Sequence, residues 1–272
     1  MRAGGFRLFA AMLGLGALLW PQEPGAATLS RAEKEHFLRT AKVLKLRHLG
    51  RGVTNSLRAT LSDGQITHDA HIQSIDVALA EFKSDRGNEL NFRDCWKFNV
   101  AGYRLGVLLG LENIPVSVER KVGGRTSAVT WWVDDVLMDE SARIAKQMGA
   151  PNPDRWNRQM AIVRVFDQLI YNTDRNLRNL LITTNWDLEM IDHTRAFRLR
   201  KEIRNPENLT RCERVLLGRL RALTREDLNR ELRPYLTRLE IEALLTRRDR
   251  IVEHFEQRVK EKGEAAVLYE MK

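Results

Sequence analysis

The segment from residue 166 to residue 197, FDQLIYNTDRNLRNLLITTNWDLEMIDHTRAF, most strongly constrains what this chain can fold into. Two short apolar runs, LLI and LEMI, follow a polar turn, which predicts a short β-hairpin after a helix. Asp174 and Asp192 each stand where the chain changes direction. Such residues are either ordinary turn and cap residues or ligands that the hairpin brings together. The rest of the chain has to decide between the two.

The bulk properties favour a folded protein with anionic partners. The 272 residues are enough for one large domain or two small lobes with a sizeable core. The 45 Lys and Arg outnumber the 36 Asp and Glu, and the net charge of +9 suits phosphorylated small molecules, nucleic acid or anionic lipid. The basic residues are spread along the chain, so a solvated basic surface explains them equally well. Cys95 and Cys212 lack metal-ligand spacing and are predicted to be free thiols, although one long-range bridge stays open.

The N-terminus has the order of a cleavable signal peptide. Arg2 and Arg7 precede or flank a thirteen-residue apolar run at 8–20, and small residues follow up to Ala27. The run is short for a membrane span, which needs about 20 residues. We therefore expect residues 1–27 to be a signal peptide or an N-terminal anchor, with no later membrane span. The protein is then exported, periplasmic or secreted; without a signal it is cytoplasmic.

The remaining chain divides into a mixed first half and a helical second half. A capping-box spacing from Ser30 to Glu33 predicts a helix, and Gly110 is placed to end another. Glycine turns at 63–64 and 123–124 predict two hairpins. The expected elements are a helix at 30–45, a hairpin at 48–79, a helix at 91–110, a hairpin at 114–133, helices at 139–169 interrupted by PNP, and helices beyond Pro206.

This order predicts an α+β protein with two lobes. The strand-rich N-lobe is expected at 28–135 and the helical C-lobe at 136–272, with a hinge near residues 133–140. A cleft between two lobes is a common place for a ligand. The hairpin of the opening segment then belongs to the C-lobe, beside the hinge.

The polar turn has the residue types that phosphoryl transfer requires. That chemistry needs a divalent metal on hard oxygen ligands and a carboxylate that orients the attacking hydroxyl. Asp174 is a candidate for the carboxylate, and Asn179 and Asp192 are candidate metal ligands. Arg175 is expected to fix the loop through an internal pair. The structural alternative is a hairpin with helix caps, for which Asp and Asn are the usual residues.

NTDRNLRN followed by LEMIDHTRAF resembles the catalytic loop and metal-binding segment of the atypical kinases: the phosphatidylinositol 3-/4-kinases, the HipA-type kinases and the secretory-pathway kinases, here in a bacterial branch. The resemblance implies a two-lobed protein-kinase-like fold that uses ATP with Mg²⁺ or Mn²⁺. It makes Asp174 the catalytic aspartate, and Asn179 and Asp192 the metal ligands. Asn176 stands where the family usually has His, and His193 where Phe is common.

The chain departs from that family at an ion pair. Kinase-like folds place a strand lysine on the phosphates and hold it with a glutamate from the next helix. Gln73 stands where the lysine is expected, and Asn99 where the glutamate is expected. Because a lone buried charge is costly, replacing both members by a hydrogen-bonded amide pair preserves the lobe. Arg58 or Lys97 is then the expected substitute cation.

The resemblance also implies where a nucleotide binds. Glycines and hydroxyl residues in the first hairpin suit phosphates, although a plain strand-bounding turn explains them too. The tryptophan before Asp134 falls at the hinge position that contacts adenine, and core packing is its alternative role. The expected nucleotide-binding residues are Gly50, Gly52, Thr54, Asn55, Ser56, Arg58, Gln73 and Trp132.

Three functions remain open on the sequence. The first is a kinase-like phosphotransferase that phosphorylates an unknown hydroxyl acceptor, which is a protein, a sugar or a lipid. The second is a pseudokinase that binds a nucleotide or a partner without transfer, because both members of the ion pair are replaced. The third is a basic helical nucleic-acid-binding protein, suggested by the arginine-rich stretches at 204–226 and 247–258. It lacks a reading motif, so no specific nucleic acid is expected.

Overall fold

The computed structural model describes residues 29–50, 56–84, 87–172 and 175–271. The predicted signal peptide or anchor at 1–27 lies outside this part, so the structure does not bear on it. Within the described ranges, none of the helices is both long and apolar enough to cross a membrane. Cys95 and Cys212 are both buried and free, as predicted.

The N-lobe is built on a five-stranded sheet in which every pair of neighbours is antiparallel. The predicted turns are both present, with Gly64, Gly123 and Gly124 at positive φ values of 93°, 57° and 84°. The strands, in spatial order, are β1 (Lys42–His48), β2 (Leu57–Ser62), β3 (Thr67–Gln73), β7 (Arg125–Trp131) and β6 (Ser117–Val122).

Two helices pack on this sheet, α1 (Arg31–Thr40) and α2 (Lys97–Leu109). The predicted capping box is present, since Ser30 and Glu33 bond reciprocally. The predicted helix was too long, however: it ends at Thr40 because Ala41 turns to an extended conformation and the following residues pair with β2. Gly110 ends α2 with φ +66°, as predicted.

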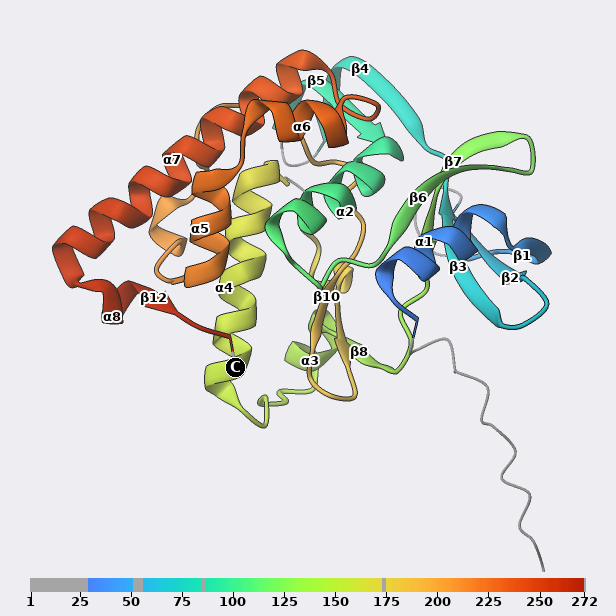
Figure 1. Cartoon of the computed structure of the whole chain (residues 1–272), viewed down its shortest axis with the longest axis horizontal. Helices are drawn as coiled ribbons and strands as arrows, with labels where there is room; N and C mark the ends of the chain where they lie inside the picture. Colours follow the sequence, from blue (N-terminus) through green and yellow to red (C-terminus); the bar gives the residue numbers. More distant parts are fainter. Residues whose placement is uncertain (1–28, 51–55, 85–86, 173–174, 272) are drawn as a thin grey trace, which may run out of the picture.

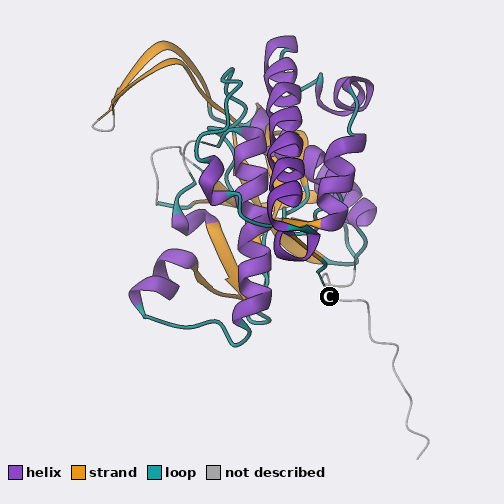
Figure 2. Ribbon diagram, turned by 90° about the vertical axis from the view of Figure 1, so that its left-hand side faces the viewer, coloured by secondary structure: helices purple, strands orange, loops and turns teal. Residues whose placement is uncertain are grey.

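The sequence did not predict the separate two-stranded hairpin that follows β3. The run at 67–79 is two strands, β3 and then β4 (Asp76–Ser84), and β4 pairs only with β5 (Gly87–Cys95). The prediction of helix from residue 91 was therefore wrong by six residues, because 91–95 continue β5 and the backbone N–H of Trp96 bonds to Ile75 at 2.7 Å. Figure 2 shows this hairpin reaching out from the body of the molecule.

The C-lobe combines a small sheet with a helical bundle (Figure 1). The two strands predicted in the opening segment are present and pair with a third, from the expected hinge region. The sheet is β8 (Val136–Asp139), β9 (Leu180–Thr183) and β10 (Leu188–Met190); the helices are α3 (Glu140–Ala145), α4 (Pro153–Ile170), α5 (Arg214–Ala222), α6 (Arg225–Leu232), α7 (Arg238–Lys262) and α8 (Glu264–Val267), with 3-10 turns η2 (Leu177–Asn179) and η3 (Pro206–Asn208) and a short pair of β11 (Cys212–Glu213) and β12 (Leu268–Tyr269).

Helix α4 is the axis of the C-lobe core. Its predicted apolar face is buried at Trp156, Val163, Phe166 and Ile170, while Met160 is only partly buried.

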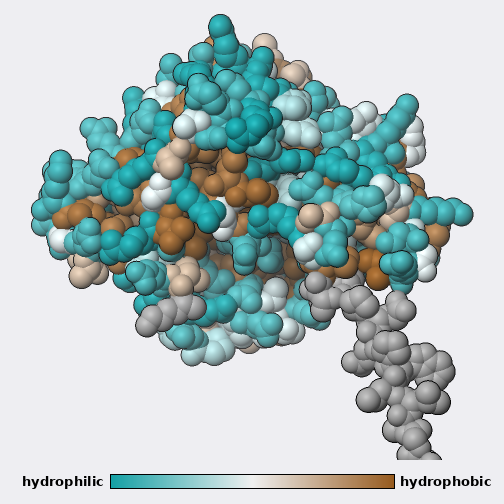
Figure 3. All heavy atoms as spheres, in the orientation of Figure 1, coloured by the Kyte–Doolittle hydropathy of each residue, from teal (hydrophilic) through white to brown (hydrophobic). Residues whose placement is uncertain are grey.

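The outer surface is mainly hydrophilic in the view of Figure 3, with apolar side chains gathered towards its middle. The two lobes thus share one continuous hydrophobic core.

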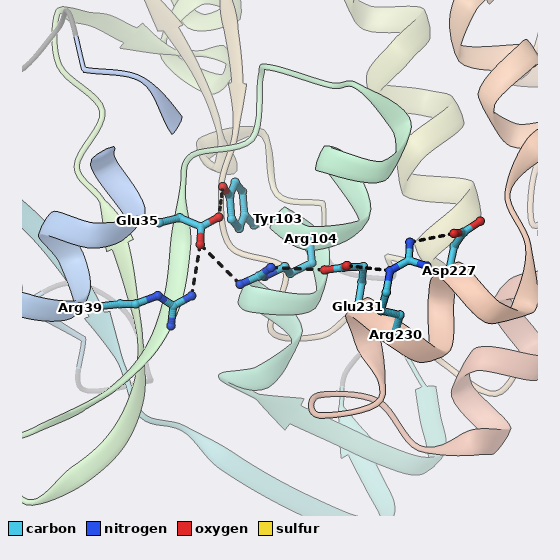
Figure 4. A network of polar contacts seen from close by, with 7 residues as sticks. All are labelled: Glu35, Arg39, Tyr103, Arg104, Asp227, Arg230 and Glu231. Carbon is cyan, nitrogen blue, oxygen red and sulfur yellow. Dashed lines mark hydrogen bonds and ion pairs between the residues drawn. The ribbon is translucent and has the colours of Figure 1, made fainter. Parts of the chain in front are cut away.

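A polar network also joins the lobes (Figure 4). Glu35 of α1 accepts hydrogen bonds from the Tyr103 hydroxyl at 2.7 Å and from Arg104 at 3.5 Å, and Arg104 reaches Glu231 of α6 at 3.3 Å. Burial and the Glu35 charge raise the pKa of Tyr103. The network holds α2 between α1 and the C-lobe. The boundary between residues 135 and 136, just before β8, remains a prediction.

Candidate functional site

The loop between α4 and β9 is fixed by Arg175. Asp167 lies in the last turn of α4, where the helix dipole disfavours a negative charge. Arg175 donates to both oxygens of Asp167, with Nε to Oδ2 at 2.9 Å, and the two side chains are only 12% and 13% exposed. Its Nη1 also donates to the carbonyls of Asn179 (3.1 Å) and Ile191 (2.8 Å). One side chain therefore holds helix, loop and hairpin together, as the predicted internal pair requires.

The hairpin brings Asn179 and Asp192 to the same edge. The backbone N–H of Ile191 donates to the carbonyl of Asn179 at 3.0 Å, one residue beyond the last pair of the β9–β10 ladder, and Asp192 follows Ile191 directly. Asn176 caps the 3-10 turn that ends at Asn179 by accepting from Arg178 N–H at 3.0 Å. The twelve residues between the candidate ligands form the β9–β10 hairpin.

Asp192 is presented to solvent by an unusual backbone. Its φ is +55°, a region that aspartate tolerates better than most residues. The side chain is exposed, and Oδ1 accepts from the Thr194 hydroxyl at 3.0 Å. An amide oxygen and a carboxylate are hard ligands that suit Mg²⁺ or Mn²⁺, and water and phosphate oxygens would fill the remaining coordination positions. In the described part of the chain, no group of three His, Cys, Asp or Glu residues is arranged to hold a metal.

Several expected site residues lie outside the described residues, namely Asp174, Gly52, Thr54 and Asn55. The ends of the glycine-containing loop are described. Gly50 has φ +60° and open space where a Cβ would stand, so backbone can approach a ligand there. At the other end the carbonyl of Ser56 accepts from Leu49 N–H at 3.1 Å, which closes the loop between β1 and β2.

The two amides that replace the ion pair have separate hydrogen-bond partners. Gln73 is 2% exposed; it donates to the Ser56 hydroxyl at 3.0 Å and accepts from Ile75 N–H at 3.0 Å. Asn99 accepts from the backbone N–H of His193 at 2.7 Å. The expected amide pair is therefore replaced by two links, one from β3 to the glycine loop and one from α2 to the segment after Asp192.

His193 is a neutral packing residue in this arrangement. Its ring lies against Gly102 of α2, where a Cβ would approach the ring within 3.2 Å, and stands edge-on to Phe166. Burial, with the nearby Arg175 charge, lowers the pKa of His193 well below its usual value. Its Nε2 is buried without a partner in the described part of the chain.

Arg58, the first of the two expected substitute cations, already has an acidic partner. Arg58 on β2 pairs with Asp69 on β3 through Nε at 2.6 Å and stacks over the Trp132 ring at 4.1 Å. Trp132 is half-buried, and its backbone N–H donates to the backbone carbonyl of Asp69 at 3.2 Å. Lys97, the other candidate, lies 5.9 Å from the Trp96 ring. Arg58 and Trp132 are thus brought together, and Asp69 orients the guanidinium.

Sequence reasoning missed three charged or titratable residues around the site. Asp167 was hidden because its partner Arg175 lies eight residues away. His71 shares a strand face with Gln73, two residues on, and alternation along β3 was a usable signal; burial lowers its pKa while the Asp192 charge opposes that shift. Glu189 lies in the middle of β10, three residues before Asp192, and burial, with the Asp187 charge, raises its pKa to about 8.

Solved structures with the same fold include two kinases. Fam20 from hydra, solved with sugar, superposes with a TM-score of 0.62 at 15% identity, covering 86% of this chain and 90% of that one. The Golgi casein kinase with Mn and ADP bound gives 0.61 at 13% identity over 88% and 78%. The Helicobacter pylori proinflammatory kinase CtkA gives 0.51 at 10% identity over 83% and 98%.

The sequence matches no protein-family model and no curated protein. The identities to the solved kinases are low, so the likeness is one of fold. It confirms the two-lobed kinase-like fold, which is the fold that the resemblance to atypical kinases implied.

Proposed function

We propose that this chain is a kinase-like phosphotransferase that uses a magnesium or manganese nucleotide, with ATP as the expected donor, to phosphorylate a hydroxyl group. The observation that best supports this is the backbone hydrogen bond that sets Asn179 opposite Ile191, the residue before Asp192, with Arg175 bonded to the carbonyls of both partners. The Golgi casein kinase, a structure with the same fold, is described with Mn and ADP bound.

Each residue has a role in this proposal. Asp174 orients the acceptor hydroxyl, and Asn179 and Asp192 hold the metal, which neutralises charge on the phosphates when it is bound. The glycine-containing loop covers the phosphates, and Trp132 contacts the base. Arg58 supplies positive charge in place of the missing strand lysine. The acceptor is a protein, a sugar or a lipid headgroup, and residues 1–27 direct export.

A nucleotide- or partner-binding pseudokinase is the second candidate. It is favoured by the partners of Gln73 and Asn99, because neither amide offers a cation to a phosphate. The arginines of the C-terminal helices give no such support to nucleic-acid binding. Many are paired with acids, among them Arg214 with Glu264 and Arg221 with Glu256.

The test is a thermal-shift titration of the full chain with ATP, ADP and GTP, with and without Mg²⁺ or Mn²⁺. A ligand that binds only the native state raises Tm by mass action. A metal-dependent rise that Asp192→Asn abolishes supports the phosphotransferase site. A rise without metal supports the pseudokinase. The absence of any rise refutes both.

Asp135→Asn is the matched control. Asp135 is also an exposed aspartate with positive φ, +53°, but it lies before β8, and its carbonyl accepts from Thr184 N–H at 2.9 Å, at the opposite end of β9 from Asn179. Because Asp and Asn both tolerate this backbone region, neither substitution strains the chain. A loss of the metal-dependent shift in both variants alike contradicts a specific role for Asp192.

A further inference from the structure

A row of basic and polar side chains crosses all five strands of the N-lobe sheet. Each residue of the row lies directly opposite the next one on the neighbouring strand; from β1 to β6 they are Arg47, Arg58, His71, Thr130 and Ser117. Residues opposite each other on neighbouring strands project from the same face of a sheet. The Ser117 and Thr130 hydroxyls lie 2.8 Å apart, as this alignment requires. Two arginines and a histidine therefore stand side by side on one face.

This face of the sheet is turned towards α2 and the C-lobe. Gln73 lies two residues after His71 on β3 and so shares its face, and it is opposite Ala128 of β7. Ala128 packs in one buried cluster with Val100 of α2. Burial lowers the pKa of His71, and the charge of Asp192 opposes that shift, so the Asp192 carboxylate acts on the His71 ring from the C-lobe. The basic row thus faces the hairpin edge that carries Asp192.

His71 lies between two parts of the proposed nucleotide site. On one side, Gln73 donates to the Ser56 hydroxyl at 3.0 Å, at the end of the glycine-containing loop, and Arg58 follows Ser56 by two residues on β2. On the other side is Asp192, the candidate metal ligand. Phosphates that the loop covers and that a metal joins to Asp192 would pass His71. Kinase-like folds place the strand lysine on the phosphates at this point.

The His71 ring has a hydrogen-bond donor to offer there. It is half-buried, and no hydrogen bond among the described residues involves its ring nitrogens. An imidazole carries at least one N–H in either protonation state. Gln73, in contrast, is 2% exposed, and its amide is bonded to the Ser56 hydroxyl and to Ile75 N–H.

We propose, on the basis of the phosphotransferase function proposed above, that His71 and not Gln73 is the β3 residue that contacts the nucleotide phosphates. Its ring N–H donates to a phosphate oxygen beside Arg58, whose guanidinium Asp69 orients at 2.6 Å. An imidazole and a guanidinium on neighbouring strands then stand where kinase-like folds use one lysine.

The test is calorimetric titration of the full chain and its variants with ATP in the presence of Mn²⁺, beside adenosine, which carries no phosphate. His71→Leu is expected to weaken ATP binding by about tenfold or more, the usual effect of losing a hydrogen bond to a charged group, and to leave adenosine binding unchanged. His71→Gln keeps an N–H donor and is expected to bind ATP more tightly than His71→Leu. His71→Lys is expected to bind ATP most tightly of the three, because a charged donor makes the stronger hydrogen bond.

His36→Leu is the matched control. His36 is exposed on α1, which covers the opposite face of the sheet, where the Phe37 and Trp131 rings lie 5.7 Å apart. This variant is expected to bind ATP and adenosine as the unmodified chain does. If it loses as much ATP affinity as His71→Leu, or if His71→Leu loses as much affinity for adenosine as for ATP, His71 has no specific contact with the phosphates.

The outcomes separate this inference from the proposed function. If ATP binds the unmodified chain and His71→Leu with the same affinity, the inference is wrong and the proposed function stands. If ATP with Mg²⁺ or Mn²⁺ does not bind the unmodified chain, both are wrong. If His71→Leu does not fold, the other two variants decide: tighter ATP binding by His71→Lys than by His71→Gln, with adenosine binding unchanged, supports the inference, and equal ATP affinities overturn it.

Discussion

Replacing Arg175 by Met is expected to destabilise the protein far more than loss of an ordinary surface ion pair. The substitution leaves the Asp167 carboxylate buried and unpaired, at 13% exposure, in the last turn of α4. Breaking a buried pair from one side costs about 3–5 kcal/mol. The Ile191 carbonyl also loses its charged donor, while Asn179 keeps the bond from Ile191 N–H. We expect a loss of about 4 kcal/mol in the free energy of unfolding.

The assay is urea denaturation of a four-member cycle: the unmodified chain, Arg175→Met, Asp167→Leu, and both together. Each single variant leaves one charge buried, and the double variant leaves none, so its loss is expected to be smaller than the sum of the two by 2 kcal/mol or more, roughly. Asn172 also donates to Asp167, at 3.2 Å, and stays in place throughout.

Arg155 with Asp187 is the matched control, because this pair also joins α4 to the β9–β10 hairpin. Its side chains are 37% and 42% exposed, and an exposed pair contributes at most about 1 kcal/mol. Arg155→Met is therefore expected to cost little. If Arg175→Met costs no more than Arg155→Met, or if the cycle is additive, Arg175 does not hold the loop.

Two further predictions concern pH. Glu189→Gln is expected to stabilise the protein relative to the unmodified chain, and by more as the pH rises from 4.5 to 8. Burial raises the native pKa of Glu189 to about 8, so in this range the carboxyl group is protonated in the native state and ionised in the unfolded state. The limit is about 1.4 kcal/mol per pH unit, and the partial exposure of Glu189 lowers it; urea denaturation that gives a pH-independent difference contradicts this. His193→Leu is expected to reduce the loss of stability below pH 6.5, because the buried native imidazole has a lowered pKa and stays neutral where the unfolded one is protonated. Equal slopes of stability between pH 7 and pH 5 in variant and unmodified chain would exclude that role.

Local rules predicted the elements whose ends are set by local chemistry. The Ser30–Glu33 capping box, the glycine turns and the left-handed Gly110 each act within a few residues, and each is present. The boundary at Thr40 failed because the residues after it have a partner strand fifteen or more residues away. Hairpin β4–β5 was missed for a different reason. It lies outside the main sheet, and its apolar residues Val77, Leu79 and Leu90 are exposed, so no alternation between a buried and an exposed face marks it.

The candidate site was predictable where spacing carries the geometry. A short hairpin sets Asn179 opposite Ile191, the residue before Asp192, and the sequence predicted that these two segments approach each other. The partners of Arg175 and Arg198 were not predictable, because they depend on how α4 and β5 pack against the hairpin segment. A sequence pattern reports which side chains share an element, and long-range contacts decide which buried charge finds a partner.

The replacement of the lysine–glutamate pair changes what α2 is attached to. In kinase-like folds that pair ties the helix to a strand across the nucleotide phosphates. Here Asn99 bonds the backbone of His193, so α2 holds the residue next to Asp192 directly, and Gly102 makes room for the His193 ring. Gln73 meanwhile supports the glycine loop through Ser56. The two amides therefore attach α2 to the residue after Asp192 and β3 to the end of the glycine-containing loop, without a charged pair between helix and strand.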